Sequence, residues 1–238
     1  ENLVNGEFHT VNTGQCKVWL KAVRIDGRLA AWMGDWRDSS KKFYFCEDEQ
    51  SLDAKSIRAL NKFNKQVSKE REEKQLQAKL QVEELTRRFT WVPDQSDYLR
   101  GKKLSPSGGV FVRLSEADAQ KILCVPMYDE SDELWNLQQL YKSGKKTFHA
   151  KARVKGLFHK IIGSSSKVLI GEGYATCLAA HASTGYETYA AFSAGNLEAV
   201  LQIVLKTNHA DNVILLGDHD GETFEREGVN PGMFETQK

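Results

Sequence analysis

Two short apolar runs near the C-terminal end of the chain constrain its fold more than any other feature. The runs cover residues 167–170 and 212–216, and each is followed directly by a glycine. Aliphatic runs of this length are typical of strands that are buried on both faces of a sheet. Periodicity alone does not distinguish such a strand from a buried helix, so the assignment depends on the pattern of the segment between the two runs.

That segment alternates between helix and strand signals. A helix-like stretch at 174–183 is closed by Gly185, and residues 188–193 form another short strand-like run. A second helix is predicted after Asn196, which stands at its N-cap position, because aliphatic residues then recur at the spacing of one helical face. The order strand, helix, strand, helix, strand predicts a parallel sheet with right-handed crossovers.

Acidic residues follow both of the outer predicted strands. Glu172 comes after the first run, and Asp218 and Asp220 come after the second. Open parallel sheets bind ligands beyond the carboxyl ends of their strands, where these three carboxylates would lie. Such a set suits Mg²⁺ or Mn²⁺ acting on phosphates. Acids at strand ends are also ordinary surface residues of α/β domains, and spacing alone does not choose between the two readings.

The motifs GEGYAT, AAFSAGNL and LLGDHDG occur in this order and resemble a TOPRIM domain. This domain is the catalytic module of bacterial-type primases, of type IA and type II topoisomerases and of some nucleases. A block farther upstream resembles the segment that precedes TOPRIM in plasmid- and phage-encoded primases. The block consists of residues 93–101, 123–129, 137–140, 144–146 and 155–158.

The resemblance implies a function and a set of site residues. The chain is expected to be a DNA primase-like nucleotidyltransferase that makes short RNA primers on single-stranded DNA. By this likeness Glu172 takes the place of the catalytic glutamate, and Asp218 and Asp220 carry the metal ions. Glu172 would coordinate metal or accept the proton of the attacking hydroxyl. The implied partners are single-stranded DNA and nucleoside triphosphates, with a replicative helicase left open and no membrane.

Two other functions stay open. The same metal site would serve a TOPRIM-type metal-dependent nuclease, although the primase-like block upstream speaks against this reading. The chain would otherwise be a non-catalytic single-stranded-DNA-binding module with a relic active site. Such a module would bind DNA in a salt-sensitive way that does not depend on magnesium.

Charge is distributed unevenly along a chain that is balanced as a whole, with 33 basic and 32 acidic residues. Residues 142–167, the basic segment, contain no Asp or Glu, which favours contact with phosphates. Phe148, His149, Phe158 and His159 lie within it and would either stack on bases or, for the two phenylalanines, pack in the core. The candidate nucleic-acid-binding or nucleotide-binding residues are Lys145, Lys146, Lys151, Arg153, Lys155 and Lys160.

The expected fold class is α/β, with a Rossmann-like parallel TOPRIM sheet as its largest feature. Four parts are predicted: a small β-rich N-terminal unit (1–50), a long charged helix or linker (51–91), a basic α+β subdomain (92–165) and TOPRIM (166–238). TOPRIM domains usually continue beyond the Asp-x-Asp motif with another helix and strand. Only 18 residues follow Asp220 and the chain begins with Glu1, so we expect a fragment with a truncated TOPRIM domain.

Within the N-terminal unit, a hairpin of 17–25 and 29–32 and a strand at 43–45 are predicted. Its tryptophans, Trp19, Trp32 and Trp36, would form the core or, with the basic residues nearby, grip a single strand. The long helix carries two apolar stripes. These are Ile57, Leu60, Phe63 and Val67, followed by Leu76, Leu80, Leu85 and Phe89.

The four cysteines form no Cys-x-x-Cys pair, which argues against a zinc ribbon within these residues. Cys124 and Cys177 lie in apolar stretches, so we expect them to be buried free thiols. Reduced cysteines favour the cytoplasm. The same location is expected because the sequence shows neither a signal peptide nor an apolar run long enough to span a bilayer.

Overall fold

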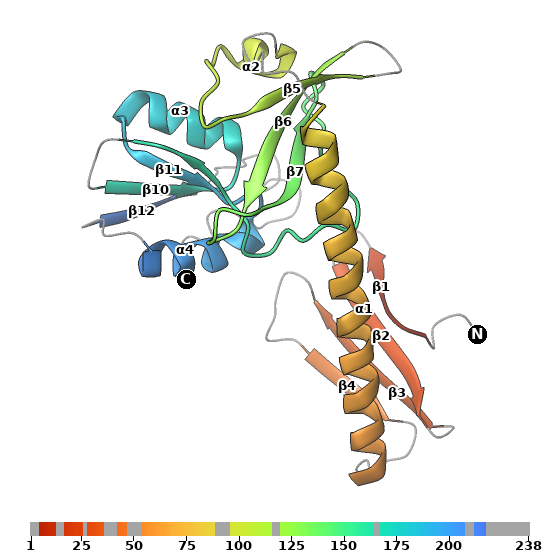
Figure 1. Cartoon of the computed structure of the whole chain (residues 1–238). Coiled ribbons are helices and arrows are strands. Elements are labelled where there is room, and N and C mark those ends of the chain that lie inside the picture. The colour runs from red at the N-terminus through yellow and green to blue at the C-terminus, as the bar shows by residue number, and fades with distance from the viewer. Residues whose placement is uncertain are drawn as a thin grey trace. The chain divides into compact units, whose positions relative to one another are not determined.

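The computed structural model describes most of the chain (Figure 1). The chain divides into two compact units, Glu1–Arg71 and Glu72–Lys238. The four-part division expected from the sequence stays a prediction. The described residues are 5–12, 17–25, 28–35, 42–46, 54–88, 96–115, 120–163, 167–207 and 212–217.

The first unit contains a four-stranded antiparallel sheet in the order β1-β2-β3-β4. The predicted hairpin is confirmed, because β2 and β3 pair from Ile25 and Arg28 onward. The strand β4 confirms the third predicted strand, while β1 was not predicted. The bounds are β1 (Asn5–Asn12), β2 (Lys17–Ile25), β3 (Arg28–Asp35) and β4 (Lys42–Cys46).

One tryptophan of this sheet packs against the neighbouring strand. Trp19 pairs with Gly34, and a Cβ atom at Gly34 would lie only 2.6 Å from the indole ring. The ring therefore fills the space that glycine leaves open, which supports a packing role for Trp19. The side chains of Trp32 and Trp36 lie outside the described residues.

The helix α1 (Ala54–Thr86) runs for 33 residues and crosses the boundary between the units. In the part that belongs to the second unit, Ala78 and Val82 are buried at 3% and 0% exposure. The second apolar stripe noted in the sequence is therefore not the buried face of this part of the helix. Small residues one turn apart form that face, while Lys79 between them binds Glu133. The described leucines of the stripe are exposed at 52%, 59% and 37%: Leu76, Leu80 and Leu85.

The second unit contains a four-stranded antiparallel meander, the sheet β5-β6-β7-β8. The central strand β6 is buried along nearly its whole length and contacts the short helix α2 (Asp97–Lys102). The strand bounds are β5 (Phe111–Leu114), β6 (Lys121–Tyr128), β7 (Leu134–Leu140) and β8 (Lys146–Phe148).

The second sheet of this unit has the order β12-β10-β11-β9. Its strands β12, β10 and β11 are parallel, which confirms the predicted topology, and β9 adds an antiparallel edge. The middle strand β11 is shorter than predicted and ends at Ala190. The bounds are β9 (His159–Ile161), β10 (Lys167–Gly171), β11 (Glu187–Ala190) and β12 (Asn212–Leu216).

Two helices cover opposite faces of this sheet (Figure 1). The helix α3 (Tyr174–Thr184) ends at Gly185, as predicted, and its buried residues share a core with β6 of the meander. The helix α4 (Leu197–Thr207) packs a second core against β10. The strand β10 is therefore buried between two layers, which explains its continuous apolar sequence.

Cys124 and Cys177 are both buried thiols, as predicted. Burial raises the pKa of the Cys124 thiol to about 12. No helix among the described residues is long and apolar enough to span a bilayer.

Candidate active site

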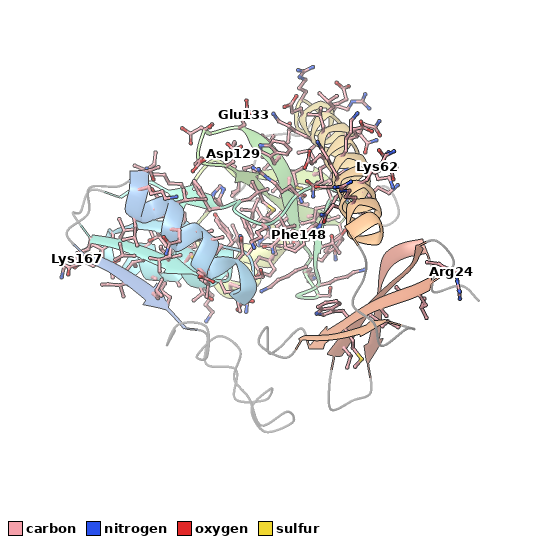
Figure 2. The ribbon with its side chains drawn as sticks, turned by 90° about the horizontal axis from the view of Figure 1, so that it is seen from below. Arg24, Lys62, Asp129, Glu133, Phe148 and Lys167 are labelled. Carbon is pink, nitrogen blue, oxygen red and sulfur yellow. The ribbon has the colours of Figure 1, made fainter. Side chains whose placement is uncertain are left out.

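The carboxyl ends of the parallel strands form one edge of the sheet. Gly171, the last residue of β10, is in register with Leu216 of β12 and with Ala190 of β11. Glu172 follows Gly171 directly and is half-buried. Lys167, the first residue of β10, lies at the opposite end of the strand (Figure 2). The sheet therefore places Glu172 at the edge where open α/β sheets bind ligands.

The main chain holds Glu172 closely at this edge. The N–H of Phe192 donates a 2.7 Å hydrogen bond to the main-chain oxygen of Glu172, and the N–H of Ala191 donates to Gly171 at 2.8 Å. Phe192 adopts a left-handed conformation with φ of 68°, which is rare for a bulky residue. Strain of this kind persists where the surrounding structure enforces it, which is common at functional sites.

The other two predicted carboxylates, Asp218 and Asp220, lie outside the described residues. The structure describes the chain up to Gly217, one residue beyond β12. Within the described part of the chain, no group of three or more His, Cys, Asp or Glu residues is arranged to hold a metal ion. The three-carboxylate site stays a prediction.

Two buried asparagines fix the main chain of the basic segment. The Asn136 side chain accepts from the N–H of His149 at 3.0 Å and donates to the oxygen of Arg153 at 2.8 Å. The Asn196 side chain accepts from the N–H of Gly156 at 2.7 Å and donates to Leu157 at 2.8 Å. The segment is thereby attached to β7 on one side and to the start of α4 on the other.

Asn196 directly precedes α4, at the position predicted for an N-cap, but its side-chain hydrogen bonds go to other segments. It lies inside a 3₁₀ turn (Ala194–Asn196) before α4, is 2% exposed, and donates a further 2.8 Å bond to Ala191. A cap would face the first turn of its own helix, whereas this side chain bonds to segments far away in the sequence. The sequence placed Asn196 in the AAFSAGNL motif and before a helix, but it gave no signal for these distant partners.

The predicted phosphate-binding residues fall into two groups. Arg153 forms an ion pair with Asp129 at 3.1 Å, and Lys160 forms one with Glu187 at 3.0 Å. Both cations are therefore already neutralised by a carboxylate. The remaining candidates are exposed: Lys145, Lys146, Lys151 and Lys155.

The strand β8 brings the basic segment to the edge that carries Glu172. The Nζ atom of Lys146 lies 3.7 Å from the position that a Cβ atom would take at Gly173, the residue after Glu172. The ring of Phe148, two residues along β8, packs edge-on against Phe192. Glu172 and Gly173 form the short loop between β10 and α3, here called the Glu172 loop. Of the predicted binding residues, Lys146 thus lies directly beside this loop.

Two of the predicted stacking rings belong to the core. Phe158 is 6% exposed and packs against Tyr189, and His159 is fully buried. Nδ1 of His159 donates to the main-chain oxygen of Pro126 at 2.9 Å, and its ring packs edge-on against Tyr174. Base stacking by these two residues is therefore excluded, because neither ring has an accessible face.

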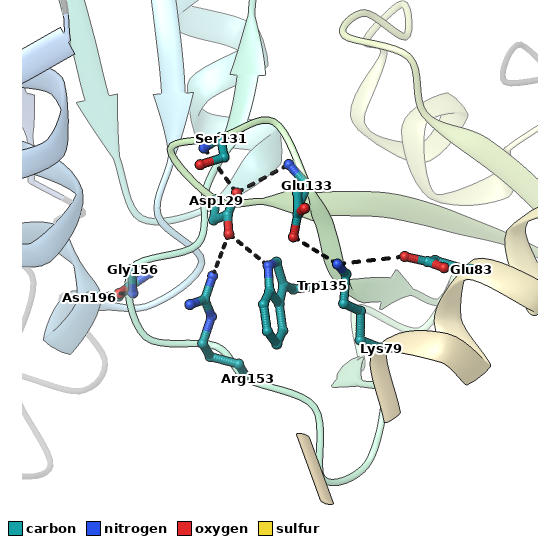
Figure 3. A network of polar contacts seen from close by, with 9 residues as sticks. All are labelled: Lys79, Glu83, Asp129, Ser131, Glu133, Trp135, Arg153, Gly156 and Asn196. Carbon is teal, nitrogen blue, oxygen red and sulfur yellow. Dashed lines mark hydrogen bonds and ion pairs between the residues drawn. The ribbon is translucent and has the colours of Figure 1, made fainter. Parts of the chain in front are cut away.

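Asp129 was identified from the sequence only as part of a motif, and the structure shows it at the centre of a network (Figure 3). Its carboxylate accepts hydrogen bonds from the main-chain N–H groups of Ser131 and Glu133 at 3.0 and 3.1 Å. It also accepts from the Trp135 indole at 2.7 Å and pairs with Arg153. Asp129 thereby links the turn after β6 to the basic segment.

Comparison with known proteins gives a family for the last part of the chain. Residues 166–230 match the Toprim domain family. A DNA primase TraC of Escherichia coli is 33% identical over 152 residues, which cover 62% of this chain and 14% of that protein. A second Escherichia coli DNA primase TraC is 30% identical over 146 residues, or 59% of this chain and 10% of that protein. The match thus spans a small part of these relatives, and no solved structure matches the chain.

The same assignment follows from three findings: the sheet is parallel, Glu172 directly follows the strand β10, and residues 166–230 match the family. The chain contains a Toprim domain, and much of its sequence is similar to that of DNA primase TraC.

Proposed function

We propose that this chain is part of a DNA primase that synthesises short RNA primers on single-stranded DNA, in plasmid or phage replication. The similarity to DNA primase TraC supports the reaction class. The single observation that carries the proposal is the approach of the basic segment to the Glu172 loop, with Lys146 Nζ beside Gly173. Nucleotidyl transfer needs cationic contacts to phosphates next to carboxylates, and a lysine beside the residue that follows Glu172 supports such a site.

Toprim domains generally bind divalent metal ions, and the residues here fit such an ion. Gly171 and Leu216 end adjacent parallel strands in register, so Glu172 and Gly217 follow them at one edge of the sheet. We assign Glu172, Asp218 and Asp220 as the ligands, since Mg²⁺ and Mn²⁺ favour carboxylate oxygens. When bound, the metal neutralises the charge of the triphosphate and polarises the phosphorus under attack.

The protein residues have separate roles in this proposal. Glu172 helps to coordinate the metal or takes the proton of the attacking hydroxyl. The exposed lysines hold the triphosphate or the template strand, with Lys145, Lys146 and Lys155 as the first candidates. The substrates are nucleoside triphosphates and single-stranded DNA, and a replicative helicase stays an untested partner. We place the reaction in the cytoplasm, where thiols such as Cys124 and Cys177 stay reduced.

Primer synthesis tests the proposal directly. The full chain is incubated with circular single-stranded DNA, labelled ribonucleotides and MgCl₂, and the products are separated by length. We expect a ladder of short RNA products, and we expect Glu172→Gln or Asp218→Asn to lower its formation by at least about 10²-fold. Glu198→Gln, an exposed glutamate on α4, is the matched control and should synthesise normally.

Three outcomes would contradict the proposal in whole or in part. Unchanged synthesis in Glu172→Gln would remove this residue from the active site. Loss of the input strand without new product, with or without nucleotides, would show the nuclease reaction instead. Salt-sensitive DNA binding with no reaction of either kind would indicate the non-catalytic module.

A further inference from the structure

The strand β8 presents two side chains on the same face, since alternate residues of a strand point to the same side. These are Lys146 and Phe148, whose main chain pairs with Leu140 and Gln138 of β7. Both side chains contact residues of the Toprim domain: Lys146 approaches Gly173, and Phe148 packs on Phe192. A cation and an aromatic ring therefore stand together beside the Glu172 loop.

Phe148 keeps an accessible surface although it is packed. Its ring centroid lies 6.3 Å from that of Phe192 at an interplanar angle of 86°, and the residue is 36% exposed. An edge-to-face contact supports one side of a ring and leaves part of its surface available for another ring. Phe192 is itself 6% exposed and is tied to Glu172 by a main-chain hydrogen bond. Phe148 is thus positioned on a rigid support connected to the candidate catalytic residue.

Lys146 supplies the charge that a nucleotide phosphate needs. Its Nζ lies 3.7 Å from the Cβ position of Gly173. Among the ion pairs of the described residues, Arg153 and Lys160 of the same basic segment are occupied by Asp129 and Glu187, whereas Lys146 is exposed. A phosphate contacting Lys146 would lie next to Glu172, while its base would reach Phe148 on the same strand face.

We propose that Lys146 and Phe148 form a nucleotide subsite, in which the base stacks on Phe148 and the phosphate of the same nucleotide contacts Lys146. This inference rests on the proposed function and deepens it by assigning the residues that recognise the nucleotide. The ligand is a base joined to a phosphate, which either the template strand or a nucleoside triphosphate supplies. Stacking tolerates any base, so the subsite would accept nucleotides with little sequence preference.

The experiment measures binding without catalysis. Fluorescence anisotropy follows a labelled decathymidylate and, in a separate arm, a labelled non-hydrolysable nucleoside triphosphate, both in the presence of MgCl₂. Phe148→Leu should weaken binding of one of them by about tenfold, and Phe148→Trp should restore it to within about twofold. Lys146→Met should lower the slope of log affinity against log salt concentration by about one. The arm that responds identifies the template strand or the triphosphate as the ligand.

A matched pair at the opposite end of the sheet serves as the control. The Nζ of Lys167, at the start of β10, lies 5.6 Å from the ring centroid of Tyr186, so this pair also combines a cation with an aromatic ring. Lys167→Met and Tyr186→Leu should leave both affinities unchanged, because Lys167 is not among the candidate phosphate-binding residues and stands at the end of β10 opposite Glu172. An abasic decanucleotide adds a second control, because it should bind wild type and Phe148→Leu equally if the base contacts this ring.

The outcomes separate this subsite from the function it depends on. Unchanged affinity of Phe148→Leu in both arms, with a folded protein by circular dichroism, would overturn the subsite. If Glu172→Gln still abolished primer synthesis in that case, the proposed function would stand. If Phe148→Leu weakens binding as expected but the wild-type protein synthesises no primers, the nucleotide-binding site would stand and the polymerase function would be rejected.

Discussion

The side-chain oxygen of Asn196 accepts a 2.7 Å hydrogen bond from the main-chain N–H of Gly156, across 40 positions of sequence. Gly156 has a φ of 75°, a conformation that glycine adopts without strain. The same side chain donates to Leu157 and to Ala191. One amide thus satisfies three main-chain groups and joins the basic segment to the sheet of the Toprim domain.

Asn196→Ala should destabilise the second unit strongly. The change leaves three buried or half-buried main-chain groups without this partner, and we expect the free energy of unfolding to fall by about 3 kcal/mol. Urea denaturation monitored by tryptophan fluorescence measures it. Asn212→Ala, at an exposed position on β12, should change the free energy by less than about 0.5 kcal/mol. Equal midpoints for the two variants would show that the three bonds contribute little.

Asp129 should make stability depend on pH in the acid range. Burial alone would raise its pKa, but hydrogen bonds from Glu133, Ser131 and Trp135 and the Arg153 charge outweigh it and hold the pKa below 3.8. A carboxyl whose pKa is lowered by folding stabilises the protein fully at pH values above its pKa in the unfolded chain. This stabilisation is lost as the pH falls through its pKa in the folded protein. Asp129→Asn should therefore be less stable than wild type at pH 7 by about 2 kcal/mol.

The pH profile distinguishes this charge effect from a packing defect. The difference between wild type and Asp129→Asn should shrink as the pH falls below 3.8, the ordinary pKa of the group. Urea midpoints at several pH values give the profile. Asp132→Asn, an exposed residue in the same turn, should match wild type throughout. A difference that stays constant down to the lowest pH would mean that the charge is not involved.

His159 should act in a separate pH window. Burial is the main cause that lowers its pKa from 6.5 to about 4, against the opposing hydrogen bond with Pro126. Between these values the unfolded chain binds a proton that the folded chain does not, so stability falls as the pH is lowered through this window. His159→Asn keeps a donor near Pro126 but cannot be protonated. Its free energy of unfolding should therefore change less between pH 6.5 and 4 than that of the wild type, by up to about 3 kcal/mol. Parallel profiles would contradict the assignment.

Two glycines should respond oppositely to alanine. Gly108 has a φ of 82°, and a Cβ atom there would collide with Nε2 of His159. Gly101 lies in α2 with nothing within 4 Å of the Cβ position. Gly108→Ala should destabilise by about 2 kcal/mol or more. Gly101→Ala should be neutral or stabilising by up to about 1 kcal/mol, because alanine favours helices. Thermal unfolding followed by circular dichroism measures both.

The cations of the basic segment should differ in their contribution to DNA binding. Lys160 is paired with Glu187 at 3.0 Å, whereas Lys155 is exposed. Lys160→Met should leave the affinity for single-stranded DNA within about twofold, while Lys155→Met should weaken it and lower the salt slope by about one. Anisotropy titrations over a range of salt concentrations test this. Equal losses would mean that Lys160 leaves Glu187 when DNA binds.

Local patterns were sufficient for the parallel sheet. The aliphatic sequence of β10 and the glycine that ends α3 are local signals, because burial on both faces and a left-handed helix end require particular residue types. The position of Glu172 after β10 follows from the same pattern. These features depend on neighbours in sequence, so the sequence alone predicted them.

Contacts between distant segments decided the rest. The sequence offered Asn196 as a helix cap and showed an apolar stripe with Leu76, yet Asn196 bonds to Gly156, and Ala78 and Val82 are buried while Leu76 is exposed. Nor did the basic segment reveal that Lys160 pairs with Glu187 while Lys146 faces the Glu172 loop. Such roles arise where strands far apart in the chain pack together. The amino-acid sequence therefore determined the strands, the helices and the chemistry available, and the tertiary structure decided which side chains meet, because packing depends on all segments at once.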